Sequence, residues 1–150
     1  MLSQYKGISP EGDLLLIERL CCQLEGKSFL HINSTRQGGG VAEILHRMIP
    51  LLKEFGIKAR WEVIEGSPEF FDVTKKIHNS LQGSPEIFTP DMWELHYEIN
   101  RKNAQEIDLE ADGVFIHDPQ PMPLIKFRPD KRGFWFWRCH IDMSSPQREP

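Results

Sequence analysis

The chain has 150 residues, of which 39% are hydrophobic, 10% aromatic and 27% charged. These values are ordinary for one globular domain with a sizeable core, and they exclude a disordered chain or a disulfide scaffold. The 18 basic and 22 acidic side chains give a net charge of −4, which is not the electrostatic footprint of a nucleic-acid-binding protein.

The N-terminal segment lacks the basic start and the apolar stretch of a signal peptide, and no apolar run is long enough to span a membrane. We therefore expect a cytoplasmic protein with no membrane partner. The three cysteines, Cys21, Cys22 and Cys139, lack the C-x-x-C spacing of zinc and redox motifs. Buried, reduced thiols are the expected state.

The first predicted element is a helix at the N-terminus. Ser9-Pro10 are typical of an N-cap and a first helical residue, and apolar side chains recur at helical spacing until Gly26. A short buried strand is expected next, at Phe29–Asn33. We therefore treat residues 1–27 as a leading helix and residues 28–150 as the domain itself.

A second helix is predicted at Val41–Phe55, directly after the glycine run Gly38–Gly40. Pro50 should kink this helix or end its first segment, because proline lacks a backbone donor and clashes with the carbonyl four residues earlier. The next strand is expected at Ala59–Ile64, and a Ser-Pro pair then opens a helix over residues 67–81.

The last part of the chain predicts one more helix and two strands. The helix begins at Thr89-Pro90 and runs through Ala104, and the strands are Gly113–His117 and Gly133–Ile141, the second after a turn at residues 129–132. The aromatic run within the last strand favours burial on both faces; a stacking platform for sugars or bases is the alternative. Strands that alternate with helices predict an α/β fold with a Rossmann-like, doubly wound parallel sheet.

The C-terminal residues suggest that the protein continues. Ser144-Ser145-Pro146 is typical of a helix start, yet only four residues follow. We expect this chain to be the front part of a longer protein, with a C-terminus that simply frays as the alternative.

Polar side chains follow three of the predicted strands. Open parallel sheets bind ligands beyond the carboxyl ends of their strands, at a topological switch point, and a cleft for a polar ligand needs such convergence. The polar residues are Asn33, Ser34 and Thr35 after the first strand, His117, Asp118 and Gln120 after the third, and His140 and Asp142 after the fourth.

The glycine run leads into a helix N-terminus, where backbone N–H groups and the helix dipole can hold an anion. A dinucleotide site is disfavoured because Glu43 occupies the third glycine position of that fingerprint, although Glu65 imitates its ribose-binding acid. A P-loop is excluded because no G-K-[ST] follows. A tight turn without a ligand is the other interpretation.

The pairs His117-Asp118 and His140-x-Asp142 suit acid/base chemistry, metal binding or hydrogen bonding to hydroxyls, and the spacing does not separate these from histidines satisfied at strand ends. A metal site is disfavoured because no Cys/His framework supplies three or four ligands, and Glu43-x-x-His46 has no second motif. We expect His31 in the core or the cleft wall. Three other histidines are expected on helix surfaces without a role: His46, His78 and His96.

Several blocks of the chain are similar to one known family. They are HINSTRQGGGVAEILHRMIPLLKEFGIKARWEVIEG, VTKKIHNSLQG, VFIHDPQP and WRCHID, in that order between about Ser28 and Pro146. This pattern resembles the N-terminal half of trehalose glycosyltransferring synthases, which are retaining, nucleotide-sugar-dependent glycosyltransferases of GT-B fold.

The resemblance implies two Rossmann-like domains that face a cleft, of which this chain would be the acceptor-sugar domain without the C-terminal donor-binding domain. The implied reaction transfers glucose from a nucleoside diphosphate glucose to glucose and forms trehalose. It implies no tightly bound cofactor, a divalent metal only as an auxiliary, an inactive isolated chain, and self-association as an option. The alternative is a non-catalytic Rossmann-like module that binds a sugar or an anion.

The resemblance also implies roles for individual residues. His140 would contact the transferred sugar at the reacting centre, and Gly38, Gly39 and Gly40 would approach the donor diphosphate. The implied acceptor ligands are Asp118, His117, Gln120 and Asp142, with Asn33, Glu65, Asn79 and Gln82 as weaker candidates that line the pocket.

Overall fold

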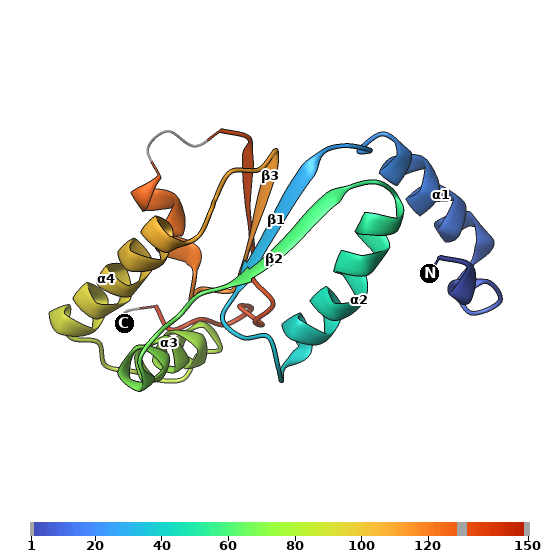
Figure 1. Cartoon of the computed structure of the whole chain (residues 1–150). Helices are drawn as coiled ribbons and strands as arrows, with labels where there is room; N and C mark the ends of the chain where they lie inside the picture. The colour runs from blue at the N-terminus through green and yellow to red at the C-terminus, as the bar shows by residue number, and fades with distance from the viewer. Residues whose placement is uncertain (1, 129–131, 149–150) are drawn as a thin grey trace.

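The computed structural model describes residues 2–128 and 132–148. Within these ranges four parallel strands form one sheet in the order β2-β1-β3-β4, which confirms the predicted Rossmann-like α/β fold (Figure 1). The predicted turn before the last strand falls largely on residues 129–131, outside the described residues. The strands are β1 Ser28–Asn33, β2 Lys58–Val63, β3 Gly113–His117 and β4 Phe134–Arg138.

Helices flank the sheet on both sides. In Figure 1, α1 and α2 lie on one side of the strands, and α3 and α4 lie on the other. The helices are α1 Glu11–Cys22, α2 Gly40–Glu54, α3 Pro68–Leu81 and α4 Pro90–Glu106, with short 3₁₀ helices at Leu2–Tyr5 and Met122–Phe127.

Each face of the sheet packs its own hydrophobic cluster, because successive side chains of a strand point to opposite faces. Leu30 and Ile32 of β1 pack with Phe70 of α3 and Val114 of β3 in the cluster beneath α3 and α4. The smaller cluster beneath α2 consists of Cys21, Leu45, Ile49, Ile57 and Ala59.

The predicted helix boundaries agree with the structure to within a few residues, and two details differ. Helix α1 begins one residue later than expected, with Pro10 rather than Ser9 at the N-cap. Helix α2 continues through Pro50 to Glu54, so the proline does not end the helix, which was one of the two outcomes expected. Pro50 itself is exposed, while Leu45 and Ile49 of the same helix are buried against the sheet, so tertiary packing holds the helix together across the proline.

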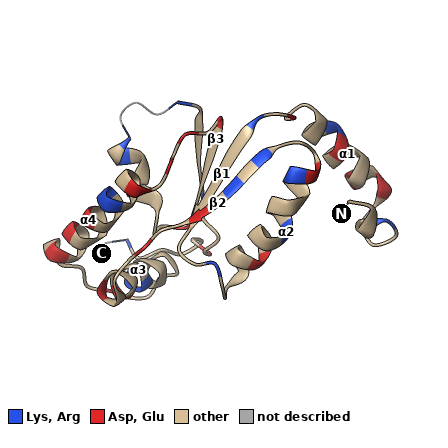
Figure 2. Ribbon diagram, viewed as in Figure 1, with Lys and Arg blue, Asp and Glu red and all other residues tan. Residues whose placement is uncertain are grey.

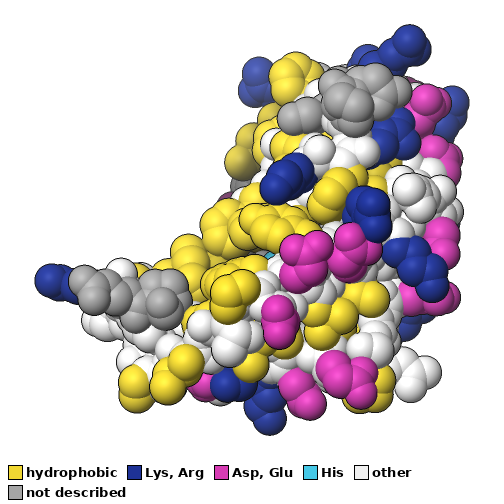
Figure 3. Space-filling view, turned by 90° about the vertical axis from the view of Figure 1, so that its left-hand side faces the viewer, with side chains coloured by type: hydrophobic (Ala, Val, Ile, Leu, Met, Phe, Trp, Pro, Cys, Tyr) yellow, Lys and Arg dark blue, Asp and Glu magenta, His cyan; other side chains and the backbone are white. Residues whose placement is uncertain are grey.

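The prediction that the last strand is buried on both faces was wrong. β4 is the edge strand and pairs only with β3 among the described strands. Phe134 is 73% exposed and Phe136 is 47% exposed. Figure 3 shows hydrophobic side chains gathered around a hollow in the surface on one side of the molecule. An aromatic run thus does not distinguish a central strand from an edge strand, since its burial depends on what covers the sheet.

Two further burial predictions were wrong. His96 was expected on a helix surface, but it is 2% exposed, and its Nε2 lies 3.1 Å from the backbone oxygen of Gln120. Of the three thiols expected to be buried, only that of Cys21 is; Cys22 is exposed and Cys139 is half-buried. Helical periodicity identifies the face of a helix that packs on the sheet, but it does not identify a contact made with a loop.

The surface carries charges of both signs. Figure 2 shows Lys and Arg residues interspersed with Asp and Glu residues, for example along α4, where Arg101 and Glu98 form an ion pair at 2.6 Å. None of the helices in the described ranges combines the length and the apolar character needed to cross a bilayer.

Candidate functional site

A cleft of about 490 Å³ opens beyond the carboxyl ends of β1 and β3. The strand order reverses between these two strands, so the cleft lies at the switch point where ligands bind in sheets of this type. The glycines Gly38–Gly40 form part of the wall, and the polar residues that line the cleft are Asn33, Ser34, Thr35, His78, Asp118, Gln120 and His140.

The glycine loop forms one wall of the cleft and leads into α2. Gly38 and Gly39 have φ angles of 74° and 81°, a left-handed conformation that strongly favours glycine. A Cβ atom at either position would meet no atom within 4 Å, so the glycines are needed for backbone conformation and not for internal space. The first N–H groups of α2 have no side-chain cap at Gly39 and are available to an anion.

Asp118 is fixed at the mouth of β3. Its φ of 65° is unusual for a residue with a side chain, and its backbone N–H donates to the carbonyl of Arg138 at 2.9 Å. Its carboxylate Oδ1 accepts a hydrogen bond from the backbone N–H of His140 at 2.7 Å. The ends of β3 and β4 are therefore connected by Asp118, which positions its carboxylate beside His140.

Gln120 lines the cleft and carries a buried acceptor without a partner among the described residues. The backbone oxygen of Gln120 accepts from His96 at 3.1 Å and from the Asn100 side chain at 3.0 Å, and these contacts hold the loop in place. The side-chain atom Oε1 is buried and has no hydrogen-bond partner among the described residues. A buried acceptor without a partner is costly and uncommon, so a ligand hydroxyl at this position would relieve an existing penalty.

Asn33 lies at the end of β1, where both ends of its side chain are engaged. Its Nδ2 donates to the backbone oxygen of Thr35 at 2.8 Å, and its Oδ1 accepts from the indole N–H of Trp61 at 2.8 Å. Asn33 therefore shapes the loop that leads to the glycines.

His117 lies behind the cleft wall. Its Nδ1 is 2.9 Å from Nε2 of His140, and its Nε2 is 3.1 Å from Nδ1 of His31. Burial, with additional repulsion from His31, His140 and Arg138, lowers the pKa of His117 to about 3. His117 is therefore neutral near pH 7 and contacts His140 rather than the open cleft.

The remaining predicted residues lie away from the main cleft. Asn79 lines an adjoining hollow of about 320 Å³, which His78 and Gln120 share with the cleft, and its amide donates to Glu86. Three predicted ligands lie outside the lining of both hollows: Glu65, Gln82 and Asp142.

Glu65 and Asp142 form hydrogen bonds with residues outside the cleft. The backbone N–H of Glu65 donates to the Asn103 side chain at 2.7 Å, and the carboxylate of Asp142 accepts from the backbone N–H of Ser144 at 2.9 Å. The bond from Ser144 lowers the pKa of Asp142. The main cleft thus brings together seven of the predicted site residues: Asn33, Gly38, Gly39, Gly40, Asp118, Gln120 and His140.

His78 is a residue of the cleft that sequence reasoning assigned no role. It lies in the last turn of α3 and lines both hollows. The block VTKKIHNSLQG contains it, next to Asn79. Membership of that block was the signal that could have identified His78.

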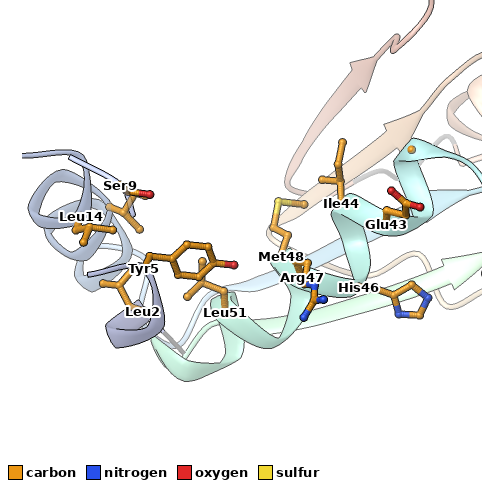
Figure 4. Close-up of a pocket in the computed structure, with 12 residues that line it drawn as sticks. Leu2, Tyr5, Ser9, Leu14, Glu43, Ile44, His46, Arg47, Met48 and Leu51 are labelled. Atoms are coloured by element: carbon orange, nitrogen blue, oxygen red, sulfur yellow. The ribbon is translucent and has the colours of Figure 1, made fainter. Parts of the chain in front are cut away.

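A larger groove, of about 1180 Å³, lies between the N-terminal segment and α2. Figure 4 shows Leu2, Tyr5 and Leu14 on one side and Met48 and Leu51 of α2 on the other. Most of its lining is apolar, and the polar groups of the strand ends do not converge there. The smaller cleft is therefore the better candidate for a functional site, because polar side chains converge in it although its volume is smaller. In the described part of the chain, no group of three or more His, Cys, Asp or Glu residues is arranged to hold a metal ion.

A comparison with protein families identifies the domain. Residues 31–150 match the family model described as "Trehalose synthase, N-terminal domain". The chain belongs to this family. The matched range includes every polar residue of the cleft wall, so the candidate site lies within the part of the chain that matches the family.

Curated relatives agree with this family. The chain is 53% identical to a trehalose synthase of Pyrococcus horikoshii over 150 residues, and 42% identical to one of Rubrobacter xylanophilus over 153 residues. Each match covers 99% of this chain but only 36% and 37% of the relative. A trehalose phosphorylase of Grifola frondosa is 33% identical over 96% of this chain and 22% of its own length.

The chain thus spans little more than a third of the length of the synthases that it matches. The family match and these synthases agree that the chain corresponds to the N-terminal domain of the trehalose synthase family.

Proposed function

We propose that the cleft binds the acceptor sugar of a retaining glycosyl transfer to glucose, with Asp118 and Gln120 as ligands of the sugar hydroxyls. The observation that carries the proposal is the buried, unpartnered Oε1 of Gln120 in a cleft that also contains the Asp118 carboxylate. A carboxylate and an amide oxygen both accept hydrogen bonds, and a sugar offers several hydroxyl donors at once. Trehalose is the compound that the names of both groups of relatives share.

The glycine loop is the proposed contact for the leaving group of the donor. A diphosphate placed before α2 would meet uncapped N–H groups and the positive end of the helix dipole. These fixed dipoles would stabilise the negative charge that develops as the bond to the transferred glucose breaks. His140 would contact that glucose on the opposite wall.

The proposed reaction joins a nucleoside diphosphate glucose and glucose to give trehalose and a nucleoside diphosphate. The bond from C1 of the donor glucose to the phosphate oxygen breaks, and a bond from C1 to the acceptor hydroxyl oxygen forms with the anomeric configuration retained. The acceptor proton passes to the departing phosphate oxygen. Residues 28–150 would supply the acceptor wall, and a separate donor-binding domain would hold the nucleotide.

The acceptor assignment is tested by calorimetric titration of Asp118→Asn with glucose. This substitution removes the charge, keeps an oxygen for the His140 N–H, and suits the left-handed backbone, which asparagine tolerates. We expect glucose binding to weaken by about 1–3 kcal/mol. Asp91→Asn on the exposed start of α4 is the matched control and should bind as the parent does. Equal affinities for Asp118→Asn and the parent would remove Asp118 from the site.

The transfer reaction is tested by assay of the chain with nucleoside diphosphate glucose and glucose, monitored for trehalose. We expect no turnover from the chain alone, because one wall of a cleft cannot hold both reactants at near-attack distance. Turnover restored by a separately expressed donor-binding domain would support the proposal. In that reconstituted enzyme, His140→Ala should lower turnover with little change in melting temperature.

The second candidate function is a non-catalytic module that binds a sugar or an anion. Its support is the same cleft, which contains both an acceptor group and an open helix N-terminus. Glucose binding without turnover in the reconstituted enzyme would favour this alternative.

A further inference from the structure

Three histidines form a continuous chain from the core to the cleft. The distance from His31 Nδ1 to His117 Nε2 is 3.1 Å, and the distance from His117 Nδ1 to His140 Nε2 is 2.9 Å. His31 and His117 are 3% and 2% exposed, whereas His140 is half-buried and lines the cleft. The chain therefore connects a buried ring to the cleft wall through two hydrogen bonds.

A neutral imidazole carries one proton, on either of its two nitrogens. Burial lowers the pKa of His31 to about 4, and burial with nearby positive charge lowers that of His117 to about 3, so both rings are neutral near pH 7. His117 can then donate only one of its two ring-to-ring hydrogen bonds and must accept the other. With all three rings neutral, the protons of the chain must all point toward the cleft or all point toward the core.

The inner end of the chain decides between these directions. His31 Nε2 is buried and has no hydrogen-bond partner among the residues that the structure describes. If the protons pointed inward, this atom would carry an N–H donor with no acceptor, and buried donors of that kind are rare. If they point outward, the last N–H lies on Nδ1 of His140, in a ring that lines the cleft, where water or a ligand can accept it.

We infer that His117 is a positioning residue that holds His140 as the tautomer with its proton on Nδ1, because the inner end of the three-histidine chain at His31 has no acceptor among the described residues. The cleft wall then offers a hydrogen-bond donor. The role of that donor rests on the proposed function: it would bond to an oxygen of the bound sugar, while Asp118 and Gln120 accept from sugar hydroxyls. The site would then combine one fixed donor with two acceptors. A sugar hydroxyl can both donate and accept, so this set fits its chemistry.

The residues around His31 and His117 disfavour other placements of the protons on these rings. Phe115 stacks on the ring of His31, with centroids 4.6 Å apart and an interplanar angle of 10°, and offers no hydrogen-bond partner. Arg138 of β4 pairs in register with His117 and adds positive charge beside it. A second proton on the His117 ring, which would give it a positive charge, is therefore disfavoured.

Nitrogen-15 NMR of the labelled chain near pH 7, without sugar, tests the inference directly, because long-range couplings show which nitrogen of each ring is protonated. We expect all three rings to carry the proton on Nδ1: His31, His117 and His140. The opposite result, a proton on Nε2 in all three, would overturn the inference. So would a His140 ring that exchanges freely between the two tautomers.

Two substitutions at His31 sharpen the test. His31→Leu leaves His117 Nε2 as the inner end without a partner, so an inward-pointing proton would again be a buried donor without an acceptor, and His140 should keep its preference for Nδ1–H. His31→Asn can present either its amide N–H or its amide oxygen to His117 Nε2, so both directions are satisfied and the preference should be lost. The matched control is Phe115→Leu, which removes the stacked ring without breaking either ring-to-ring bond, and it should leave the His140 signals as in the parent. If His31→Asn does not fold, the parent and His31→Leu spectra still decide the question.

Glucose titrations separate this inference from the proposed function. We expect His31→Leu to bind glucose about as the parent does, and His31→Asn to bind it about twofold more weakly, because only about half of its His140 rings carry the proton on Nδ1. If the parent shows the Nδ1–H tautomers but does not bind glucose, the proposed function fails and the histidine arrangement stands. If the parent binds glucose and His31→Asn leaves the His140 tautomer unchanged, the inference fails and the proposed function stands.

Discussion

On the side of the sheet that α3 and α4 cover, the central strands present aliphatic side chains, such as Leu30 and Ile32 of β1, which are fully buried. On the side that α2 covers in part, the same strands present His31, Asn33 and His117, which are almost as deeply buried. The first side contains the larger apolar cluster, whereas the second combines a smaller apolar cluster with hydrogen bonds that end in a cleft. Equal burial therefore has different consequences on the two sides.

This difference predicts how substitutions divide. Removal of a buried aliphatic group costs the energy of transfer and of the cavity that remains, and these terms act on stability alone. Replacement of a polar group near the cleft changes which hydrogen bonds a ligand can complete, and that effect falls on binding. Substitutions on the two sides should therefore separate stability from recognition.

The largest expected effect is on the apolar side. Leu30→Ala should lower the free energy of unfolding by about 2–5 kcal/mol, because Leu30 is fully buried in the cluster beneath α3 and α4. Urea denaturation followed by circular dichroism measures this change. The fraction that remains folded should bind glucose as the parent does, and a loss of binding without loss of stability would contradict the division between the two sides.

The next effect belongs to the polar side and depends on pH. His31 and His117 have folded-state pKa values of about 4 and about 3, both below the ordinary value of 6.5. Between its folded-state pKa and 6.5, each histidine binds more protons in the unfolded chain than in the folded one. The free energy of unfolding is therefore highest above pH ~6.5 and falls as the pH is lowered. We expect a loss on the order of 2 kcal/mol for each histidine by pH ~5.

The measurement is a series of melting temperatures between pH ~7 and pH ~5. The groups that face these rings are His140 and Arg138, and Phe115 stacks on His31 without a charge. His31→Leu should show a smaller fall in melting temperature over this range than the parent. An identical pH dependence in both proteins would show that His31 does not titrate with folding.

The smallest effect is expected at Gln120. Gln120→Met keeps the size of the side chain and removes a buried acceptor that has no partner among the described residues, so stability should stay the same or rise slightly. Glucose binding should weaken by about 1 kcal/mol, because the acceptor is then missing from the cleft. Thermal melting and calorimetry on the same sample measure the two quantities. A destabilised variant with unchanged glucose affinity would show that Gln120 serves the fold.

Much of the apolar side could be predicted from the sequence. Periodicity and the Ser-Pro and Thr-Pro pairs predicted α3 and α4 closely, and Ser67 caps α3 by accepting from the N–H of Phe70 at 3.3 Å. The parallel direction of the strands followed from their alternation with helices. These features depend on local patterns, which a single sequence contains in full.

The polar side depended on information that local patterns lack. The link from His117 to His140 requires the register of β3 with β4 and the turn held by Asp118. The exposure of β4 depends on what lies beyond it in the sheet, and the burial of His96 depends on a loop more than 20 residues away in the chain. Rules of spacing found the strand ends that converge, but they could not separate Asp118 from Asp142, which lies outside the cleft.

The central claim is that the cleft at the ends of β1 and β3, and not the larger apolar groove beside α2, binds the sugar. An NMR titration of the nitrogen-15-labelled chain with glucose, taken above the millimolar range, tests it most directly. The account predicts shifts of the backbone amides of Asp118, Gln120 and His140, with those of Leu14 and Met48 in the groove unchanged. Shifts confined to the groove, or no shifts at all, would contradict it.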